Sequence, residues 1–333
     1  MTPESATDAR PSSRKLVIQI PCFNEEQTLP ETLADLPREI PGFASVEWLV
    51  IDDGSTDRTV DVARAHGVDH VVELGYNQGL AAAFTAGLDA ALRAGADVVV
   101  NTDADNQYDG SCIADLVQPI NDGEAGMVVG ERPIEAVEEF SPTKKRLQRW
   151  GSGVVRAASG TDIRDAASGF RAFDRETAMQ LQVFGRYSYT METIVQAGWQ
   201  GIRVVGVPIR VNPATRESRL VKSVPQYVWR SGQTIVRSFA LYKPFRFFAL
   251  LSTLPLAMGV LLVVRWCVLK WFTVDVASRV PSLVAAAVCF VFAALVAMVG
   301  LLADLLSVNR RMIAEVRLSL RRRDLDDAAR PVE

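Results

Sequence analysis

The sequence is poor in the residues that build disulfide frameworks and metal clusters. Its 333 residues include four cysteines and two histidines. No two cysteines form a C-x-x-C pair, and Cys267 and Cys289 fall inside long apolar stretches. His66 and His70 stand four residues apart, with no cysteine or third ligand near them. We therefore predict neither a disulfide framework nor a zinc site, and we interpret the histidines as a helix end and the loop after it.

An excess of charge of one sign is also missing. The formal net charge of -3 gives no global electrostatic footprint for nucleic acid, so a nucleic-acid partner is not expected. An export signal is missing as well. Residues 1–14 are rich in Ser, Thr, Pro and Ala and lack the apolar stretch of a signal peptide, so we predict a disordered leader there.

Between residue 15 and about residue 220, short β-branched runs alternate with segments of helical periodicity. This alternation predicts an α/β fold in which helices cover a largely parallel sheet. The predicted strands are residues 16–20, 47–51, 70–74, 97–101, 126–129, 169–173 and 202–211. The predicted helices are residues 25–36, 57–66, 79–94, 111–121, 144–159 and 189–198.

After residue 220 the sequence becomes strongly apolar. Residues 221–244 place apolar side chains on one side and Arg230 and Arg237 near the other, which predicts an amphipathic interfacial helix. Residues 247–264 and 282–303 are 18 and 22 residues long and contain no charge. As helices they would measure about 27 and 33 Å, enough to span a bilayer. We predict a two-helix transmembrane hairpin over residues 245–306 and a basic tail over residues 307–333.

Basic residues flank the outer ends of this hairpin. They are Lys243 and Arg246 before it, and Arg310, Arg311, Arg317 and residues 321–323 after it. By the positive-inside rule, both termini and the catalytic domain are expected in the cytoplasm. Three further basic residues in the linker, Arg265, Lys270 and Arg279, reduce this asymmetry.

Two acidic clusters follow predicted strands. Asp103, Asp105 and Gln107 come after the fourth strand, and their alternate spacing on an extended chain would present three oxygens side by side. Hard oxygen ligands at the carboxyl end of a sheet suit Mg²⁺ or Mn²⁺ together with a diphosphate. Asp52 and Asp53 end the second strand, where alternation allows only one of them to face the same cleft; we predict Asp57 to be a helix N-cap.

As an ordered set, these motifs resemble the family 2 glycosyltransferases of GT-A fold, in the dolichol-phosphate mannose synthase-like branch. The resemblance covers residues 15–220 and places the chain near members with a membrane hairpin. The motifs that carry it are Pro21-Cys-Phe23-Asn24-Glu25, Asp52-Asp53-Gly54-Ser55-Thr56-Asp57, Asn77-Gln-Gly79, Asp103-Ala-Asp105-Asn-Gln107 and Ser168-Gly169-Phe170-Arg171.

The resemblance implies a Rossmann-like domain that transfers a sugar from a GDP- or UDP-sugar to a polyprenyl or dolichyl phosphate. It implies that the nucleoside is held by Pro21, Phe23, Glu25 and Asp53, with Asp53 hydrogen-bonded to the base. The Mg²⁺ or Mn²⁺ ion and the diphosphate would be surrounded by Asp103, Asp105 and Gln107. Cations near the phosphates would be Arg132 and Lys145, and Ser168 would face the site from the loop that closes the acceptor side.

The segment after the last strand departs from the pattern of that branch. The branch commonly has an arginine followed by Gly-x-Ser-Lys-Leu, whereas here Arg216 and Arg219 occupy the glycine and lysine positions. We assign Arg216 to the acceptor phosphate, and Arg210 could fill the same role after a small shift. Lys145 stands where an arginine is usual, so a bidentate contact would be lost there.

In the implied reaction, a lipid phosphate oxygen displaces the nucleoside diphosphate in a single inverting step. A phosphate monoester is largely dianionic at neutral pH, so no general base is needed and Asp165→Asn should be tolerated. The alternative is a family 2 enzyme that extends a lipid-linked saccharide or polysaccharide, with Asp165 as the base. Gln148-Arg149-Trp150 lacks the spacing of the Q-x-x-R-W element of processive synthases. The sequence leaves the sugar, the prenyl length and homo-oligomerisation open.

Overall fold

The computed structural model describes residues 14–133, 151–153, 155–156, 159–183, 189–213, 232–233, 236, 240, 244–272 and 280–328. It divides into two units, Met1–Ile235 together with Leu318–Glu333, and Val236–Arg317. The first 13 residues, most of the predicted interfacial helix, and the candidate residues Lys145 and Arg216 lie outside the described residues.

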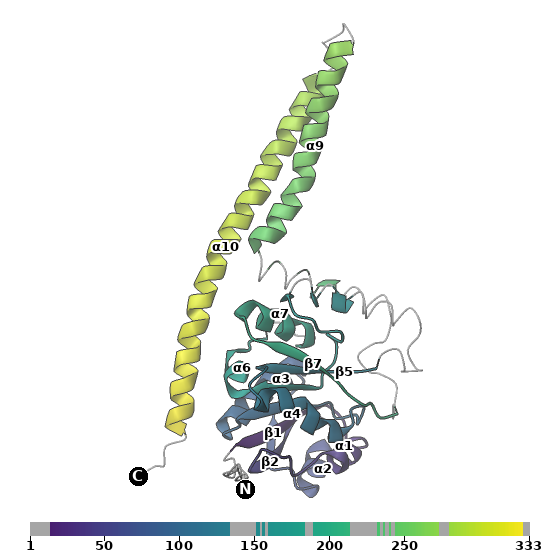
Figure 1. Cartoon of the computed structure of the whole chain (residues 1–333), viewed down its shortest axis with the longest axis vertical. Helices are drawn as coiled ribbons and strands as arrows, with labels where there is room; N and C mark the ends of the chain where they lie inside the picture. The colour runs from purple at the N-terminus through teal and green to yellow at the C-terminus, as the bar shows by residue number, and fades with distance from the viewer. Residues whose placement is uncertain are drawn as a thin grey trace, which may run out of the picture. The chain divides into compact units, whose positions relative to one another are not determined.

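A mixed sheet forms the centre of the first unit (Figure 1). Within the described residues it has seven strands in the order β3-β2-β1-β4-β6-β5-β7. The strands are β1 (Lys15–Cys22), β2 (Ser45–Asp52), β3 (His70–Glu73), β4 (Val98–Asn101), β5 (Met127–Glu131), β6 (Arg171–Asp174) and β7 (Val204–Pro208). Neighbours run parallel except at β6, which is antiparallel to both β4 and β5.

Every predicted strand is present, and β7 is shorter than the segment 202–211 that was expected. The helices of this unit are α1 (Leu29–Asp35), α2 (Thr59–Ala65), α3 (Leu80–Arg93), α4 (Ile113–Asn121, after the 3-10 turn Gly110–Cys112), α6 (Arg175–Gln180) and α7 (Thr190–Gln200). Of the predicted helix 144–159, residues 151–153, 155–156 and 159 are described, and they are helical.

Helix α6 was not predicted from the sequence. It is a short helix that begins where β6 ends, and Asp174 caps it by accepting a hydrogen bond from Thr177 N at 2.6 Å. Asp174 is thus both the last residue of β6 and the N-cap of α6. No loop residues separate the two elements, so the sequence pattern does not mark where the helix begins. His66 is the C-cap of α2, as expected, whereas His70 opens β3 instead of lying in a loop.

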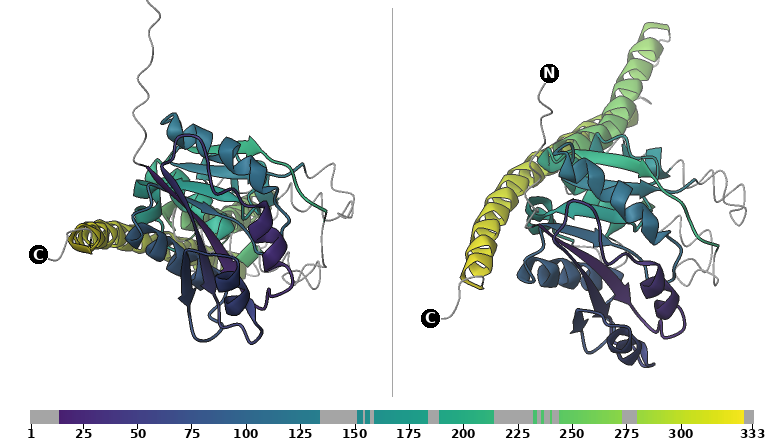
Figure 2. Two further views of the ribbon diagram at one scale, coloured as in Figure 1. Left: turned by 90° about the horizontal axis from the view of Figure 1, so that it is seen from below. Right: turned by 60° about the horizontal axis from the view of Figure 1, so that its bottom comes forward.

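The two faces of the sheet have different coverings, as Figure 2 also shows. On one face, alternate residues of β1 pack with α1 and α4 in an apolar core: Leu16, Ile18, Ile20, Leu29, Leu33, Ile113, Leu116 and Val117. On the other face, α3 packs on β1 and β2. This second face carries the buried polar side chains Gln19, Asn101 and Arg171, each at 0% exposure. Because side chains alternate along a strand, one sheet supports both environments.

The second unit is built from α9 (Pro244–Phe272) and most of α10 (Val280–Ala328). Both helices contain a segment long and apolar enough to cross a membrane, Pro244–Trp271 and Val280–Leu325, judged by length and composition. The helices pack closely at glycines: a Cβ at Gly259 would lie 2.7 Å from the ring of Phe290. Small residues at such crossings let apolar helices approach each other.

The predicted basic tail is largely helical, because α10 continues to Ala328. Its last turns belong to the first unit. There Arg321 donates to Asp89 Oδ1 at 3.1 Å and to the backbone oxygen of Met179, also at 3.1 Å. Both partners lie on the α3 and α6 side of the sheet.

If α9 and α10 anchor the chain, the full-length protein should stay in the membrane pellet after alkaline carbonate extraction. A chain that ends after Leu220 should move to the supernatant and still bind nucleotide, because the sheet keeps its core. Loss of the partly buried Arg321 contact should lower its stability by about 1 kcal/mol. Fractionation and nucleotide titration of both chains test this, and full-length protein in the carbonate supernatant would contradict it.

Candidate active site

The carboxyl ends of three parallel strands meet at one edge of the sheet. Cys22 at the end of β1 pairs with Asp52 at the end of β2, and Gln19 pairs with Asn101 at the end of β4. The polar motifs of the sequence follow these three strand ends. The sheet register therefore brings the three motifs to one edge, as expected for an open α/β fold.

The loops after β1 and β2 are joined by hydrogen bonds. Asn24 adopts a left-handed backbone with φ 55°, and its Oδ1 accepts from Thr56 N at 2.8 Å. Its own N–H donates to Ser55 Oγ at 2.9 Å, and Glu25 N donates to Thr59 Oγ1 at 2.8 Å. These loops line a hollow of about 290 Å³ formed by Asn24, Glu25, Glu26, Gln27, Thr28, Thr56 and Asp57. The motif asparagine is thus a link between two loops.

Asp52 and Asp53 point to different partners, as the alternation of a strand predicts. Asp52 accepts from Ser55 N, at 3.1 Å to Oδ2. Asp53 is 4% exposed and accepts from Gln78 N at 2.7 Å and from Gly79 N at 2.9 Å. Its carboxylate therefore clamps the loop that leads into α3. The bend at Gly54 (φ 75°) requires glycine, since a Cβ there would lie 2.5 Å from the backbone of Tyr76.

The expectation that Asp57 is the N-cap of α2 is corrected by one residue. The helix begins at Thr59, and Arg58 occupies the N-cap without a side-chain cap bond. Asp57 nevertheless accepts from Thr59 N at 3.0 Å and from Glu26 N at 3.1 Å. Partial burial alone would raise the pKa of Asp57, but these hydrogen bonds outweigh it and lower the pKa below its usual range. It joins the same two loops as Asn24.

The chain after β4 turns and does not stay extended, so the expected backbone conformation of residues 103–107 is wrong. Residues 104–105 form a turn, and Asn106 has a φ of 54°. Both carboxylate oxygens of Asp103 lie against Gly169, 3.0 Å from the place of its Cβ. Asp105 Oδ1 instead accepts from Gln107 N at 3.3 Å. The turn sends Asp103 inward, toward β6.

The two carboxylates still lie close enough to repel each other. Burial, and then the charge of Asp105, raises the pKa of Asp103 to about 7. Within the described residues, no group of three or more His, Cys, Asp or Glu side chains could hold a metal by itself. A pair of carboxylates without a full protein cage matches a Mg²⁺- or Mn²⁺-type ion that takes its other ligands from water and a diphosphate. The residues present therefore fit such an ion.

The segment after β7 returns to this acidic loop. Tyr108 forms an isolated antiparallel bridge with Val211, and Asn212 N donates to Gln107 O at 2.9 Å. Arg210, the alternative phosphate ligand, is committed elsewhere: its Nε donates to Asp109 Oδ2 at 2.6 Å and its Nη2 to Ser111 Oγ at 2.6 Å. The chain leaves this loop at Pro213, three residues before Arg216.

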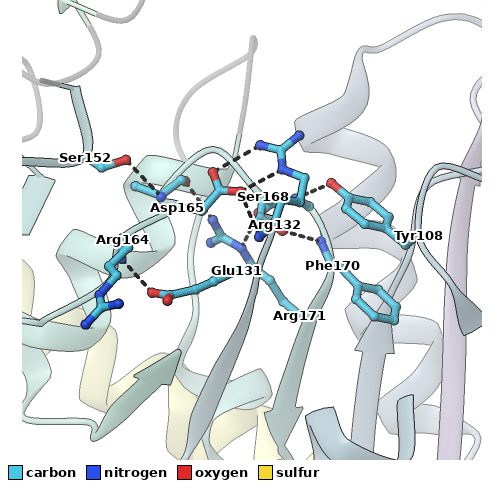
Figure 3. A network of polar contacts seen from close by, with 11 residues as sticks. Tyr108, Glu131, Arg132, Ser152, Arg164, Asp165, Ser168, Phe170 and Arg171 are labelled. Carbon is cyan, nitrogen blue, oxygen red and sulfur yellow. Dashed lines mark hydrogen bonds and ion pairs between the residues drawn. The ribbon is translucent and has the colours of Figure 1, made fainter. Parts of the chain in front are cut away.

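Arg132 forms a two-bond ion pair with Asp165 (Figure 3). Its Nε donates to Oδ2 at 2.6 Å and its Nη2 to Oδ1 at 3.0 Å. The Asp165 side chain is 1% exposed and that of Arg132 is 14% exposed. Burial alone would lower the pKa of Arg132, but the charge of Asp165 and then that of Tyr108 hold it above its ordinary value. The predicted phosphate ligand is therefore present as a fixed cation.

Ser168 is fully buried, and its Oγ accepts from Phe170 N at 3.3 Å. It thus holds the loop before β6, and its predicted role on the acceptor side stays a prediction. The neighbouring Arg171 is also fully buried. It donates to Ser168 O (2.8 Å), Ala166 O (2.9 Å), Thr190 O (2.6 Å) and Thr193 Oγ1 (2.6 Å). Burial lowers its pKa to about 10, which leaves it charged at neutral pH.

A row of buried polar groups crosses the sheet beneath the site. Gln19 Nε2 donates to Asn101 Oδ1 at 2.8 Å, and Asn101 Nδ2 donates to Gly169 O at 2.9 Å and Tyr189 Oη at 2.8 Å. The Tyr189 ring stacks on Phe84 of α3 with centroids 3.9 Å apart. Tyr108 stacks on Phe170 at 5.0 Å and accepts from Gly169 N at 3.0 Å.

Sequence reasoning missed this second layer, which consists of Asn101, Tyr108, Arg171 and Tyr189. The available signal was a charged residue inside a predicted strand: Arg171 opens β6 between the apolar Phe170 and Ala172. A buried arginine requires partners, and it therefore predicts a polar network. Of the residues expected at the nucleoside, Pro21 lies within β1 and is buried, Glu25 is 9% exposed and Phe23 is 38% exposed.

Comparison with known proteins identifies the class. Residues 17–181 match the family model for glycosyl transferase family 2. A dolichyl-phosphate hexose transferase of Haloferax volcanii is 32% identical over 212 residues, which cover 62% of this chain and 86% of the relative. An uncharacterized protein of Methanocaldococcus jannaschii is 30% identical over 59% of this chain and 81% of its own length. The chain therefore belongs to glycosyl transferase family 2.

The fold agrees with that class. Glucosyl-3-phosphoglycerate synthase from Mycobacterium tuberculosis, solved with Mn²⁺, uridine diphosphate and glucosyl-3-phosphoglycerate, superposes with a TM-score of 0.52. The match covers 68% of this chain and 79% of the synthase at 20% sequence identity. The first unit is thus a GT-A fold, and two long apolar helices accompany it.

The Arg171 network generates a stability prediction. Arg171→Met should lower the free energy of unfolding by roughly 3–5 kcal/mol, because it removes a buried charge with four hydrogen bonds and takes the Arg171 donors away from the oxygens of Ala166 and Ser168. Urea unfolding followed by tryptophan fluorescence tests this. The matched control is Arg164→Met, an exposed arginine near the same loop, which should change stability by less than about 0.5 kcal/mol. Equal midpoints for the two variants would contradict the structural role of Arg171.

Proposed function

We propose that this glycosyltransferase transfers a sugar from a nucleotide-sugar to a polyprenyl phosphate at the cytoplasmic face of a membrane. The observation that carries the proposal is the pair Asp103 and Asp105 at the end of β4, beside the fixed cation Arg132, in a chain with two membrane-length apolar helices. The 32% identity to a dolichyl-phosphate hexose transferase supports the acceptor class.

The donor would bind across the ends of β1, β2 and β4. Asp53 fixes the loop before α3, and each of its oxygens has a further lone pair for the base. Pro21, Phe23 and Glu25 border the same loops. Asp103, Asp105 and Gln107 would hold Mg²⁺ or Mn²⁺ with the diphosphate. When bound, that ion supplies positive charge that stabilises the leaving group.

The acceptor phosphate would enter from the side of the 210–220 segment. The described chain leaves the acidic loop at Pro213, three residues before Arg216 in the sequence. We retain Arg216 as the acceptor ligand, because Arg210 is already bound to Asp109 and Ser111. Lys145 would complete the cationic lining. Apolar helices and basic flanks would concentrate a lipid acceptor by holding the enzyme at the membrane.

In the reaction, an acceptor phosphate oxygen forms a bond to the anomeric carbon as the bond to the diphosphate breaks. The nucleoside diphosphate leaves with the electron pair, and the configuration inverts. The acceptor oxygen is already deprotonated at neutral pH, so no residue has to remove a proton. Arg132 would stabilise the charge that develops on the leaving diphosphate, and the rigid loops would hold both substrates in line.

A direct assay tests the proposal. Purified full-length protein in lipid bilayers is incubated with polyprenyl phosphate and a panel of GDP- and UDP-sugars, and products are identified by mass spectrometry. A polyprenyl phosphate sugar is the expected product. Transfer only to a lipid-linked saccharide, with polyprenyl phosphate unused, would favour the saccharide-extending alternative instead.

The metal generates the next prediction. Asp105→Asn removes one carboxylate charge at the expected ion and should lower kcat at least 100-fold, or about 2.7 kcal/mol in transition-state stabilisation. EDTA should abolish wild-type turnover, and added Mn²⁺ should restore it. Asp115→Asn, on the exposed side of α4, is the matched control and should keep wild-type rates. Full activity in EDTA would refute a metal requirement.

The acceptor contact is tested separately. Arg216→Ala should weaken use of polyprenyl phosphate by about 1.5–3 kcal/mol, the range for a hydrogen bond to a charged group, while donor affinity stays near wild type. Arg210→Ala is the comparison, and it should weaken acceptor use less because Arg210 already has partners. Steady-state kinetics with varied acceptor measure both effects. The opposite ranking would assign the role to Arg210.

A further inference from the structure

Asp165 is the one carboxylate that the saccharide-extending alternative would need as a base. The structure surrounds it with donors. Both its oxygens accept from Arg132, and the backbone N–H of Arg132 also points at Oδ2, at 3.4 Å. Its side chain is 1% exposed. A base must reach the proton that it removes, and this carboxylate is covered by a guanidinium.

The pair leaves one edge of Arg132 available. Its bonds to Asp165 use Nε and Nη2, and within the described part of the chain Nη1 has no hydrogen bond. Figure 3 shows the guanidinium between Asp165 and Tyr108, with its other edge turned away from the carboxylate. Tyr108 directly follows the acidic loop, and the charge of Arg132 lowers the pKa of Asp103 against the effect of burial. The Nη1 edge of Arg132 therefore lies in the same part of the site as Asp103.

The neighbouring contacts hold Asp165 itself in place. Ser168 N donates to Asp165 O at 3.3 Å, and Arg171 donates to the oxygens of Ala166 and Ser168, which follow Asp165 in the same loop. Glu131, which precedes Arg132 in β5, accepts from Arg164 N at 2.6 Å. The loop that carries Asp165 is therefore fixed to the end of β5, next to Arg132, and it holds the Nε and Nη2 edge of the guanidinium.

We propose that Asp165 is a positioning residue, which holds the Nε and Nη2 edge of Arg132 so that Nη1 can bind the departing diphosphate. This inference rests on the proposed function for the identity of the leaving group. It replaces the expectation that Asp165→Asn is tolerated. An asparagine has only one acceptor oxygen, and its amide N–H groups would face Arg132 donors, so the two-bond geometry is lost.

A double-mutant cycle tests whether Asp165 acts through Arg132. The full-length proteins are wild type, Asp165→Asn, Arg132→Lys and the double variant, assayed in bilayers with nucleotide-sugar and polyprenyl phosphate. Lysine keeps the charge beside Asp165 but cannot form the fork. Each single change should lower kcat on the order of 100-fold. The kcat of the double variant should be no more than about threefold below that of the less active single variant, because both changes break the same interaction.

The outcome that would overturn the proposal is a loss in the double variant equal to the product of the two single losses. Asp165→Asn with kcat within threefold of wild type would also overturn it. The acid limb of the pH profile, set by the acceptor phosphate, should be the same in wild type and Asp165→Asn; disappearance of that limb would identify Asp165 as a base. Asp162→Asn is the matched control, an exposed carboxylate near the same loop.

Folding and function are separated by two further measurements. If Asp165→Asn shows no unfolding transition, Arg132→Lys alone decides: wild-type kcat in that variant would overturn the proposal. If wild-type protein makes no lipid-linked sugar, the proposed function fails. The cycle is then measured by release of nucleoside diphosphate during hydrolysis of the donor, which needs the leaving-group contact but no acceptor. Non-additive losses there would still support positioning by Asp165.

Discussion

The buried guanidinium of Arg171 is the interaction on which the site depends. A buried charge is costly unless all its donors find acceptors, and here they bind the loop before β6 and the first turn of α7. That loop carries Asp165, and Asp165 fixes Arg132. Three segments far apart in the sequence are therefore positioned by one side chain. An apolar residue in its place would take the donors away from the carbonyl oxygens of Ala166 and Ser168, so packing alone could not hold the loop in this conformation.

The same network explains how two carboxylates can remain close together at the end of β4. Asp103 lies among Tyr108, Arg132 and Gly169, and its pKa is raised by burial and by Asp105. Two cations, Arg132 and Arg171, partly offset this repulsion. The balance leaves the site short of positive charge, which an ion of the Mg²⁺ class would supply. Arg132 then lies beside the place where negative charge would develop during transfer.

Most of the fold was predictable, because it follows from local patterns. β-branched runs gave the strands, and alternation placed Asp52 and Asp53 on different partners. The turn after Asp103 was missed, because a D-x-D spacing is equally compatible with an extended chain. Only the contacts of Asp103 with Gly169 and Tyr108 favour the turn. The hydrogen bonds of Ser168 and Asp165 were missed for a related reason. Their partners, Phe170 N and Arg132, are set by tertiary packing that no local periodicity encodes.

The pairing of Arg132 with Asp165 would also affect the balance between sugar transfer and hydrolysis of the donor. A mobile arginine would need to be ordered each time a donor binds, at the expense of binding energy. A fixed guanidinium with one covered edge is ordered in advance, and under our proposal its open edge would bind the diphosphate. Under the proposed function, the Asp165 carboxylate binds Arg132 with both oxygens and would not activate water. One buried ion pair can thereby favour transfer to a phosphate, which needs no base, over hydrolysis, which does.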